Sequence, residues 1–128
     1  MIIHDYLDHQ IEYEKKYGEN TLVLMQVGSF FEFYGVDNHN EKIGNTKHIA
    51  ELLNIQLTRR NKSILENSRD NCLMAGFPTH SLKRFVQMLI SSNYTIVLIE
   101  QVTLPPNPKR EVTQIFSPGT YIEEISNY

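Results

Sequence analysis

The sequence is poor in cysteine and has no long apolar run. Cys72 is the only cysteine among 128 residues, so an internal disulfide is excluded and an intracellular, reducing compartment is expected. No apolar run approaches the roughly 20 residues of a membrane-spanning helix. The first five residues also lack the basic and apolar pattern of a signal peptide. The sequence therefore predicts no membrane partner.

A surplus of positive charge is also lacking. Twelve lysines and arginines face fifteen aspartates and glutamates, which gives a formal net charge of −3. Stand-alone nucleic-acid binders usually carry a basic face, because neutralising phosphates supplies most of their affinity. The charge therefore argues against a strong nucleic-acid binder that acts alone.

The common signatures of metal, nucleotide and catalytic sites are missing as well. The five histidines show no paired spacing with cysteine or carboxylates that would form a metal site. No phosphate-binding loop of the form G-x-x-x-x-G-K-S/T is present. The acidic residues are scattered, whereas a magnesium-dependent nuclease needs them clustered. Cys72 suits a small core position better than a nucleophile. We expect a domain with no catalytic residues, no metal and no cofactor of its own.

The remaining pattern predicts a single compact α/β domain, a mixed β-sheet flanked by helices. Strands alternate with helices, and a hydrophobic content of 41% is enough for one core. Residues 37–45 and 60–71 read as polar loops, and residues 72–76 as a short apolar segment that fits an edge strand. We expect helices at 3–16, at a segment capped by Asn45 or Thr46, and from Ser81 onward, and strands at 22–27, 30–34, 55–59, 94–99 and 111–116.

The stretch 28–34 contains the main candidate functional residues of the chain. Strand periodicity places Phe31 and Phe33 on one face and Phe30, Glu32 and Tyr34 on the other. If Phe31 and Phe33 face the core, Phe30 and Glu32 lie side by side on the outer face. From the residues alone, an exposed Phe30 is often covered by a loop or a neighbouring domain, and the alternative for Glu32 is an ordinary solvated glutamate on a strand.

Four segments, in order, resemble the MutS family of DNA mismatch repair proteins. The run at 27–32, Val-Gly-Ser-Phe-Phe-Glu, is similar to the family's Gly-Asp-Phe-Tyr-Glu signature. The run at 55–60, Ile-Gln-Leu-Thr-Arg-Arg, resembles its Leu-Thr-Lys-Arg segment. The run at 74–80, Met-Ala-Gly-Phe-Pro-Thr-His, resembles Met-Ala-Gly-Ile-Pro-x-His. Finally, Ile-Glu-Gln-Val at 99–102 and Ser-Pro-Gly-Thr at 117–120 resemble Glu-Gln-Ile and Thr-Pro-Gly-Thr. These matches span nearly the whole chain.

This resemblance implies that residues 1–128 form an N-terminal mismatch recognition domain. Phe30 would be the wedge that enters the minor groove and stacks on a mispaired or unpaired base. Glu32 would hydrogen-bond that base, either accepting from an imino group or, when protonated, donating to a ring nitrogen. The partner would be double-stranded DNA with a mismatch or small loop. Ser29 stands where the family commonly has an acid, which removes one negative charge and keeps a hydroxyl.

Secondary DNA contacts are expected from Val27, Ser29, Arg59, Arg60, Lys62 and His80. Only Arg59 and Arg60 match basic positions of the family, and strand alternation allows just one of them to share a face with Phe30. Lys62 and Arg69 are further candidates for phosphate contacts, which position a duplex without reading bases. A solvated basic loop is the alternative. His80 would touch a phosphate or pack near the helix start, and packing is the favoured interpretation.

The family resemblance also implies a larger parent protein. Its ATPase, with ATP and Mg²⁺, would lie in other domains, and a second subunit would help to clamp the duplex. The tail from about residue 121 would lead into a connector domain. The alternative function is a MutS-like domain kept as a protein-interaction or structural module. The sequence does not indicate which genome the protein serves or which lesions it prefers.

Overall fold

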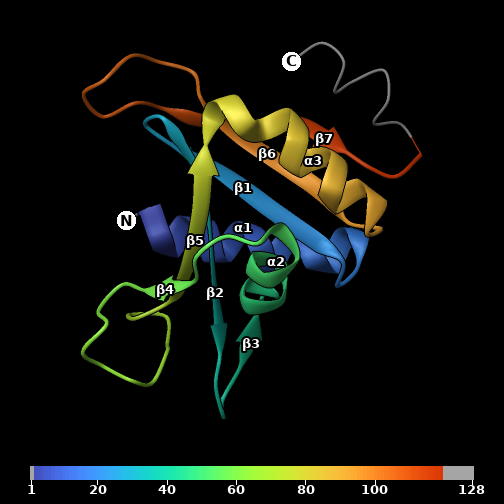
Figure 1. Cartoon of the computed structure of the whole chain (residues 1–128). Coiled ribbons are helices and arrows are strands. Elements are labelled where there is room, and N and C mark those ends of the chain that lie inside the picture. Colours follow the sequence, from blue (N-terminus) through green and yellow to red (C-terminus); the bar gives the residue numbers. More distant parts are fainter. Residues whose placement is uncertain (1, 120–128) are drawn as a thin grey trace.

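The computed structural model describes residues 2–119 as three α-helices and a mixed sheet (Figure 1). The expected tail from about residue 121 lies outside the described residues. In chain order the elements are α1 (Ile2–Tyr17), β1 (Thr21–Val27), β2 (Phe30–Asp37), β3 (Lys42–Ile43), α2 (Thr46–Leu53), β4 (Thr58–Arg59), β5 (Leu73–Pro78), the 3-10 turn η1 (Thr79–Ser81), α3 (Leu82–Ser91), β6 (Thr95–Gln101) and β7 (Arg110–Phe116).

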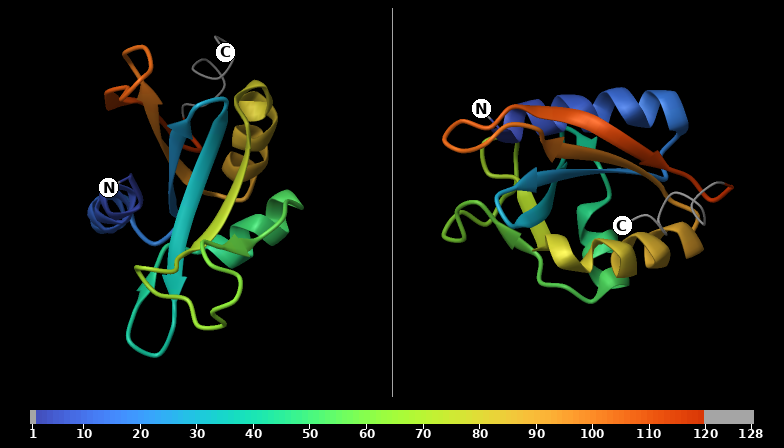
Figure 2. Two further views of the ribbon diagram at one scale, coloured as in Figure 1. Left: turned by 90° about the vertical axis from the view of Figure 1, so that its left-hand side faces the viewer. Right: turned by 90° about the horizontal axis from the view of Figure 1, so that it is seen from above.

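The sheet order is β4-β5-β2-β1-β6-β7, with β3 paired to the far end of β2. Among the strands of the described residues, only β1 and β6 pair in parallel, and the other pairs are antiparallel. Helix α1 covers one face of the sheet, and α2 and α3 lie on the other side (Figure 2, left). The expected mixed α/β fold is confirmed.

The face alternation of β2 positions the candidate site. Phe31 and Phe33 are buried, and Phe31 lies against Phe77, which in turn packs on Phe85 of α3. Phe30, Glu32 and Tyr34 point to the opposite face, as expected. Tyr34 is nevertheless buried, because α1 covers its end of the strand. Helix α1 leaves the other end of that face open at Phe30, which is 44% exposed.

Two expected strands differ from the structure. The strand expected at 55–59 shrinks to β4, because the Ile55 N–H bonds to the carbonyl of Ala50 at the end of α2. The segment expected as an edge strand at 72–76 is instead an interior strand, β5, between β4 and β2. Six residues of β5 pair with β2, so its backbone groups are satisfied on this side.

Local capping and turn chemistry account for the other differences. Residues 37–45 contain β3, which forms a hairpin with the end of β2. Asn45 takes the N-cap position of α2 without a side-chain cap bond, and its amide donates instead to the Tyr94 hydroxyl at 3.1 Å. The helix expected from Ser81 begins one residue later, after η1.

The polar residue Gln10 belongs to the buried face of α1. Its amide donates to the Thr21 carbonyl at 2.7 Å, and its carbonyl oxygen accepts from the Val23 N–H at 2.9 Å. Beside it, the Tyr6 hydroxyl donates to the Val23 carbonyl at 2.7 Å. These bonds fix α1 on β1, and the apolar periodicity of the helix gave no sign of them.

Candidate nucleic-acid interface

A tight turn places Phe30 at the start of β2. Val27 and Phe30 are paired across the hairpin, so only Gly28 and Ser29 connect β1 to β2. Gly28 has a φ of +60°, a conformation that glycine adopts without steric cost and that suits the first position of such a turn. The Ser29 carbonyl accepts from the Thr79 N–H at 2.8 Å, which ties the turn to the end of β5.

Phe30 and Glu32 share one groove of about 430 Å³. Strands β2 and β5 form its floor, where Glu32 lies directly opposite Gly76 in the antiparallel register. Arg59, Arg60 and Lys62 bring positive charge to the same groove. Its other lining residues are Gln56, Thr58, Met74, Ala75 and Gly76. An exposed aromatic ring, a carboxylate and three cationic side chains thus meet in one depression.

Both Arg59 and Arg60 line the groove, whereas strand alternation predicts that just one of them shares a face with Phe30. Strand β4 ends at Arg59, so Arg60 is no longer bound to the period of two. The guanidinium of Arg59 donates to the Ile64 and Lys62 carbonyls, each at 3.0 Å. Arg59 therefore folds the loop that carries Lys62, and it holds Lys62 beside the groove.

The Glu32 carboxylate has a protein partner on its own strand. The Tyr34 hydroxyl donates a hydrogen bond to Glu32 Oε1. Burial, followed by the hydrogen bond to Glu32, raises the pKa of Tyr34 far above its ordinary value, so the hydroxyl stays protonated and acts as a donor. The sequence placed Tyr34 on the correct face but gave it no role in the site.

Sequence comparison identifies the family. The model of MutS domain I matches residues 7–125. The chain belongs to the MutS domain I family. It is 34% identical over 122 residues to a DNA mismatch repair protein MutS of Streptococcus gordonii, covering 92% of this chain and 12% of that protein. It is 31% identical over 121 residues to a putative DNA mismatch repair protein MutS homologue of Acanthamoeba polyphaga mimivirus, covering 94% and 11%. The chain thus spans about an eighth of the length of these relatives.

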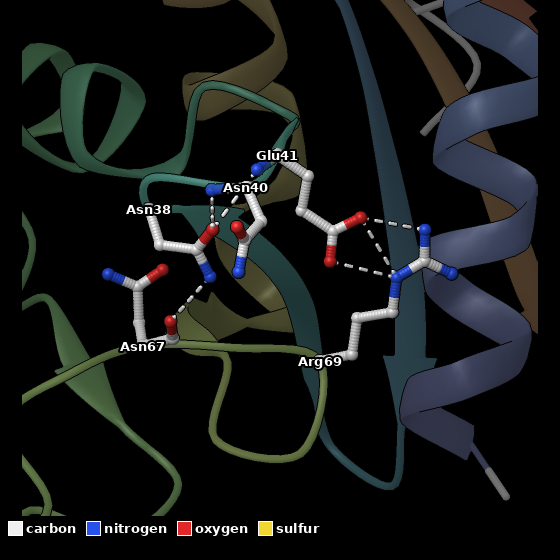
Figure 3. Close-up of polar contacts among 5 residues, drawn as sticks. All are labelled: Asn38, Asn40, Glu41, Asn67 and Arg69. Atoms are coloured by element: carbon white, nitrogen blue, oxygen red, sulfur yellow. Dashed lines mark hydrogen bonds and ion pairs between the residues drawn. The ribbon is translucent and has the colours of Figure 1, made fainter.

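Arg69 lies away from the groove in this MutS domain I. Its guanidinium forms a two-pronged contact with the Glu41 carboxylate, with N–O distances of 2.8–3.1 Å. Nearby, the Asn38 amide donates to the Asn67 carbonyl at 2.8 Å (Figure 3). The loop 60–71 is therefore fastened to the β2–β3 hairpin, and Arg69 serves this attachment. Its expected phosphate contact is not supported.

The remaining predicted residues of the MutS domain I lie near the Phe30 end or in the core. Val27 is half-buried and Ser29 is exposed in the turn. His80 is exposed, with its ring Nδ1 3.4 Å from the Ser81 hydroxyl oxygen near the start of α3, so its exposure lends no support to the packing interpretation. Cys72 is fully buried, and burial raises the pKa of its thiol to about 11, as suits a core residue.

Within residues 2–119, no group of three or more histidine, cysteine, aspartate or glutamate side chains could hold a metal ion. Over the same range, no helix has both the length and the apolar character needed to cross a bilayer.

Proposed function

We propose that this chain is the mismatch-reading module of a MutS-like DNA repair protein and performs no catalysis itself. Phe30 wedges into the minor groove and stacks on a mispaired or unpaired base, and Glu32 hydrogen-bonds that base. The observation that carries the proposal is the groove, in which a 44% exposed Phe30 lies beside Glu32 and three cationic side chains.

The physics of DNA deformation explains how such a pair would select a lesion. An apolar wedge must offset an unstacking cost of a few kcal/mol per base step. A mispaired base is already poorly held, so unstacking it costs less than unstacking a matched pair. Selectivity then comes from local deformability together with one hydrogen bond from the lesion to Glu32. A carboxylate is unfavourable for general DNA binding, since phosphates repel it, but it suits a residue that reads one base.

The basic side chains would position the duplex. Arg60 and Lys62, which line the groove, would meet phosphates there, and Arg59 holds the Lys62 loop. Val27, Ser29 and His80 would add lesser contacts near the Phe30 end. Because the chain carries a net charge of −3, the other domains of the parent protein and a second subunit would hold most of the duplex. ATP and Mg²⁺ would bind in those other domains.

The test is anisotropy titration of labelled matched and G·T-mismatched duplexes at low salt with the full-length protein that carries this chain. Phe30→Ala should reduce the mismatch preference about five- to a hundredfold, since stacking a base on an aromatic ring is worth about 1–3 kcal/mol. Glu32→Ala should also lower the preference. The control is Tyr17→Ala on α1, which removes another exposed ring, 40% exposed, and should change nothing.

A mismatch preference that survives Phe30→Ala would contradict the wedge. Binding that is equal for both duplexes and insensitive to salt would favour the alternative, a module that binds another protein, because DNA binding weakens steeply as salt rises.

A further inference from the structure

Glu32, which lines the groove, forms a fixed pair with the neighbouring buried Tyr34. They are two residues apart on β2 and therefore project from the same face. The Tyr34 hydroxyl donates to Glu32 Oε1, and the hydroxyl remains protonated because of its burial. A carboxylate has two oxygens and about four acceptor sites. A bond to one oxygen therefore orients the group and leaves the other oxygen able to accept from a ligand.

The Tyr34 ring is itself held rigidly. Tyr34 is 3% exposed and meets Tyr6 of α1 edge-to-face, with ring centroids 4.9 Å apart and an angle of 80° between the rings. Tyr6 in turn bonds to the Val23 carbonyl of the neighbouring strand. The hydroxyl that meets Glu32 is thus connected to α1 and to the centre of the sheet. A donor fixed in this way costs little entropy when its acceptor binds a ligand.

Gly76 confines the other side of the Glu32 side chain. A Cβ atom at Gly76 would lie 3.3 Å from Glu32 Cγ and 2.8 Å from the Phe31 carbonyl oxygen. The aliphatic stem of Glu32 therefore lies across the bare backbone of its strand partner. Stem and carboxylate are both restrained, although a glutamate on an exposed strand face would ordinarily move among several rotamers.

We propose that Tyr34 is a positioning residue for mismatch recognition: it holds Glu32 by Oε1, so that Oε2 takes the hydrogen bond from the displaced base. This inference rests on the proposed function and adds to it the residue that pre-organises the base contact. The gain is selective, because a preset carboxylate helps only the duplex whose base reaches it.

The experiment removes the hydroxyl and keeps the ring. In the full-length protein, Tyr34→Phe should lower the mismatch preference about three- to tenfold and leave matched-duplex affinity unchanged, as expected for one lost hydrogen bond. Tyr94→Phe is the matched control: it removes the hydroxyl of another buried tyrosine, one that accepts from Asn45 and does not line the groove. It should leave the preference unchanged.

A double-mutant cycle separates positioning from mere stability. In a Glu32→Ala background, Tyr34→Phe should cause no further loss of preference, because the hydroxyl acts only through Glu32. An additive loss, or an unchanged or increased preference in Tyr34→Phe alone, would overturn the proposal. Glu32→Asp, which keeps the charge and withdraws it by one methylene, gives a second measurement that leaves Tyr34 and its packing intact; it should lose preference to a similar extent.

The same measurements distinguish the positioning role of Tyr34 from the proposed mismatch-reading function on which it rests. Loss of preference in Phe30→Ala with no effect of Tyr34→Phe would remove the positioning role and keep the wedge. Retained preference in Phe30→Ala would remove the proposed function itself.

Discussion

At the residue scale, the groove depends on an absent side chain at Gly76. An added methyl group would meet the Phe31 carbonyl oxygen at 2.8 Å, closer than real Cβ contacts, and would press on the Glu32 stem. Because backbone cannot move aside cheaply, we expect Gly76→Ala to lower the free energy of unfolding by about 1–3 kcal/mol. We also expect it to reduce the mismatch preference. Urea unfolding and anisotropy titration measure the two effects.

Gly119→Ala is the control for this change. A Cβ atom there would meet no atom within 4 Å, so stability and binding should match those of the unmodified protein. Wild-type stability in Gly76→Ala would show that β5 and β2 separate freely, contrary to the close contact described above.

Cys72 gives a second prediction at this scale. Its side chain is fully buried, and burial raises the pKa of the thiol to about 11. The thiol is neutral in both states below its unfolded pKa, about 8.5. As pH rises from there toward 11, the unfolded chain ionises first, so stability should fall over that window. Urea unfolding between pH 8 and 11 measures this loss, and Cys72→Ala should lessen it.

The thiol should also resist reagents in the native state. At pH 8, an aromatic disulfide reagent should react with Cys72 slowly in buffer and rapidly in urea. Rapid reaction of the native protein would show that β5 opens locally far more often than its burial implies.

At the element scale, the sequence predicted most of the framework and few of its attachments. Period-two alternation correctly separated Phe31 and Phe33 from Phe30 and Glu32, because alternation is a property of the strand itself. It could not reveal that α1 buries Tyr34, since that depends on where a distant helix packs. Alternation also gives no information on Arg60, because β4 ends at Arg59.

The two polar loops are the clearest example of what local patterns miss. Residues 37–45 and 60–71 each read as irregular, yet they bind one another. The Asn67 side chain forms two hydrogen bonds with the backbone of Asp37, and Arg69 forms an ion pair with Glu41. The partners are about thirty residues apart in the chain, and nothing in either segment alone indicates the pairing.

This attachment yields a prediction for Glu41→Gln. The variant loses the ion pair with Arg69, so the loop 60–71 should exchange its amide hydrogens faster, while β1 and β6 should not change. Hydrogen exchange read by mass spectrometry measures both regions. The matched control is Glu51→Gln, which neutralises an exposed carboxylate on α2. If the loop of Glu41→Gln exchanged its amide hydrogens at the same rate as in the unmodified protein, the ion pair would not restrain the loop.

The pH dependence of the Arg69–Glu41 ion pair has a definite sign. The hydrogen bonds from Arg69 hold the pKa of the Glu41 carboxyl below its ordinary value. A carboxyl with a lowered folded pKa contributes stability above its unfolded pKa and loses it as pH falls through the folded value. Unmodified protein and Glu41→Gln should therefore differ in loop exchange at pH 7 and converge in acid.

At the scale of the whole molecule, the chain is acidic, but positive charge is concentrated at the candidate site. The net charge is −3, but the groove gathers Arg59, Arg60 and Lys62 around a single carboxylate. Under the proposed function, such a site would give a small electrostatic contribution and would read the base through direct contact. A small electrostatic contribution from this domain, with most phosphate contacts made elsewhere, fits a chain that corresponds to about 12% of the length of a MutS relative.

Substitution of Lys62 in the full-length protein tests the electrostatic contribution of the groove to DNA binding. If Lys62 neutralises one phosphate, Lys62→Gln should weaken binding to matched and mismatched duplexes equally and reduce the slope of log K against log salt by about 1. The mismatch preference should not change, because a phosphate contact carries no base information. Lys83→Gln removes another exposed lysine, from α3 on the far side of the sheet, and should leave slope and affinity unchanged. A selective loss of mismatched binding in Lys62→Gln would instead place this lysine against the displaced base, so that the groove would read the lesion with a cation as well as with Phe30 and Glu32.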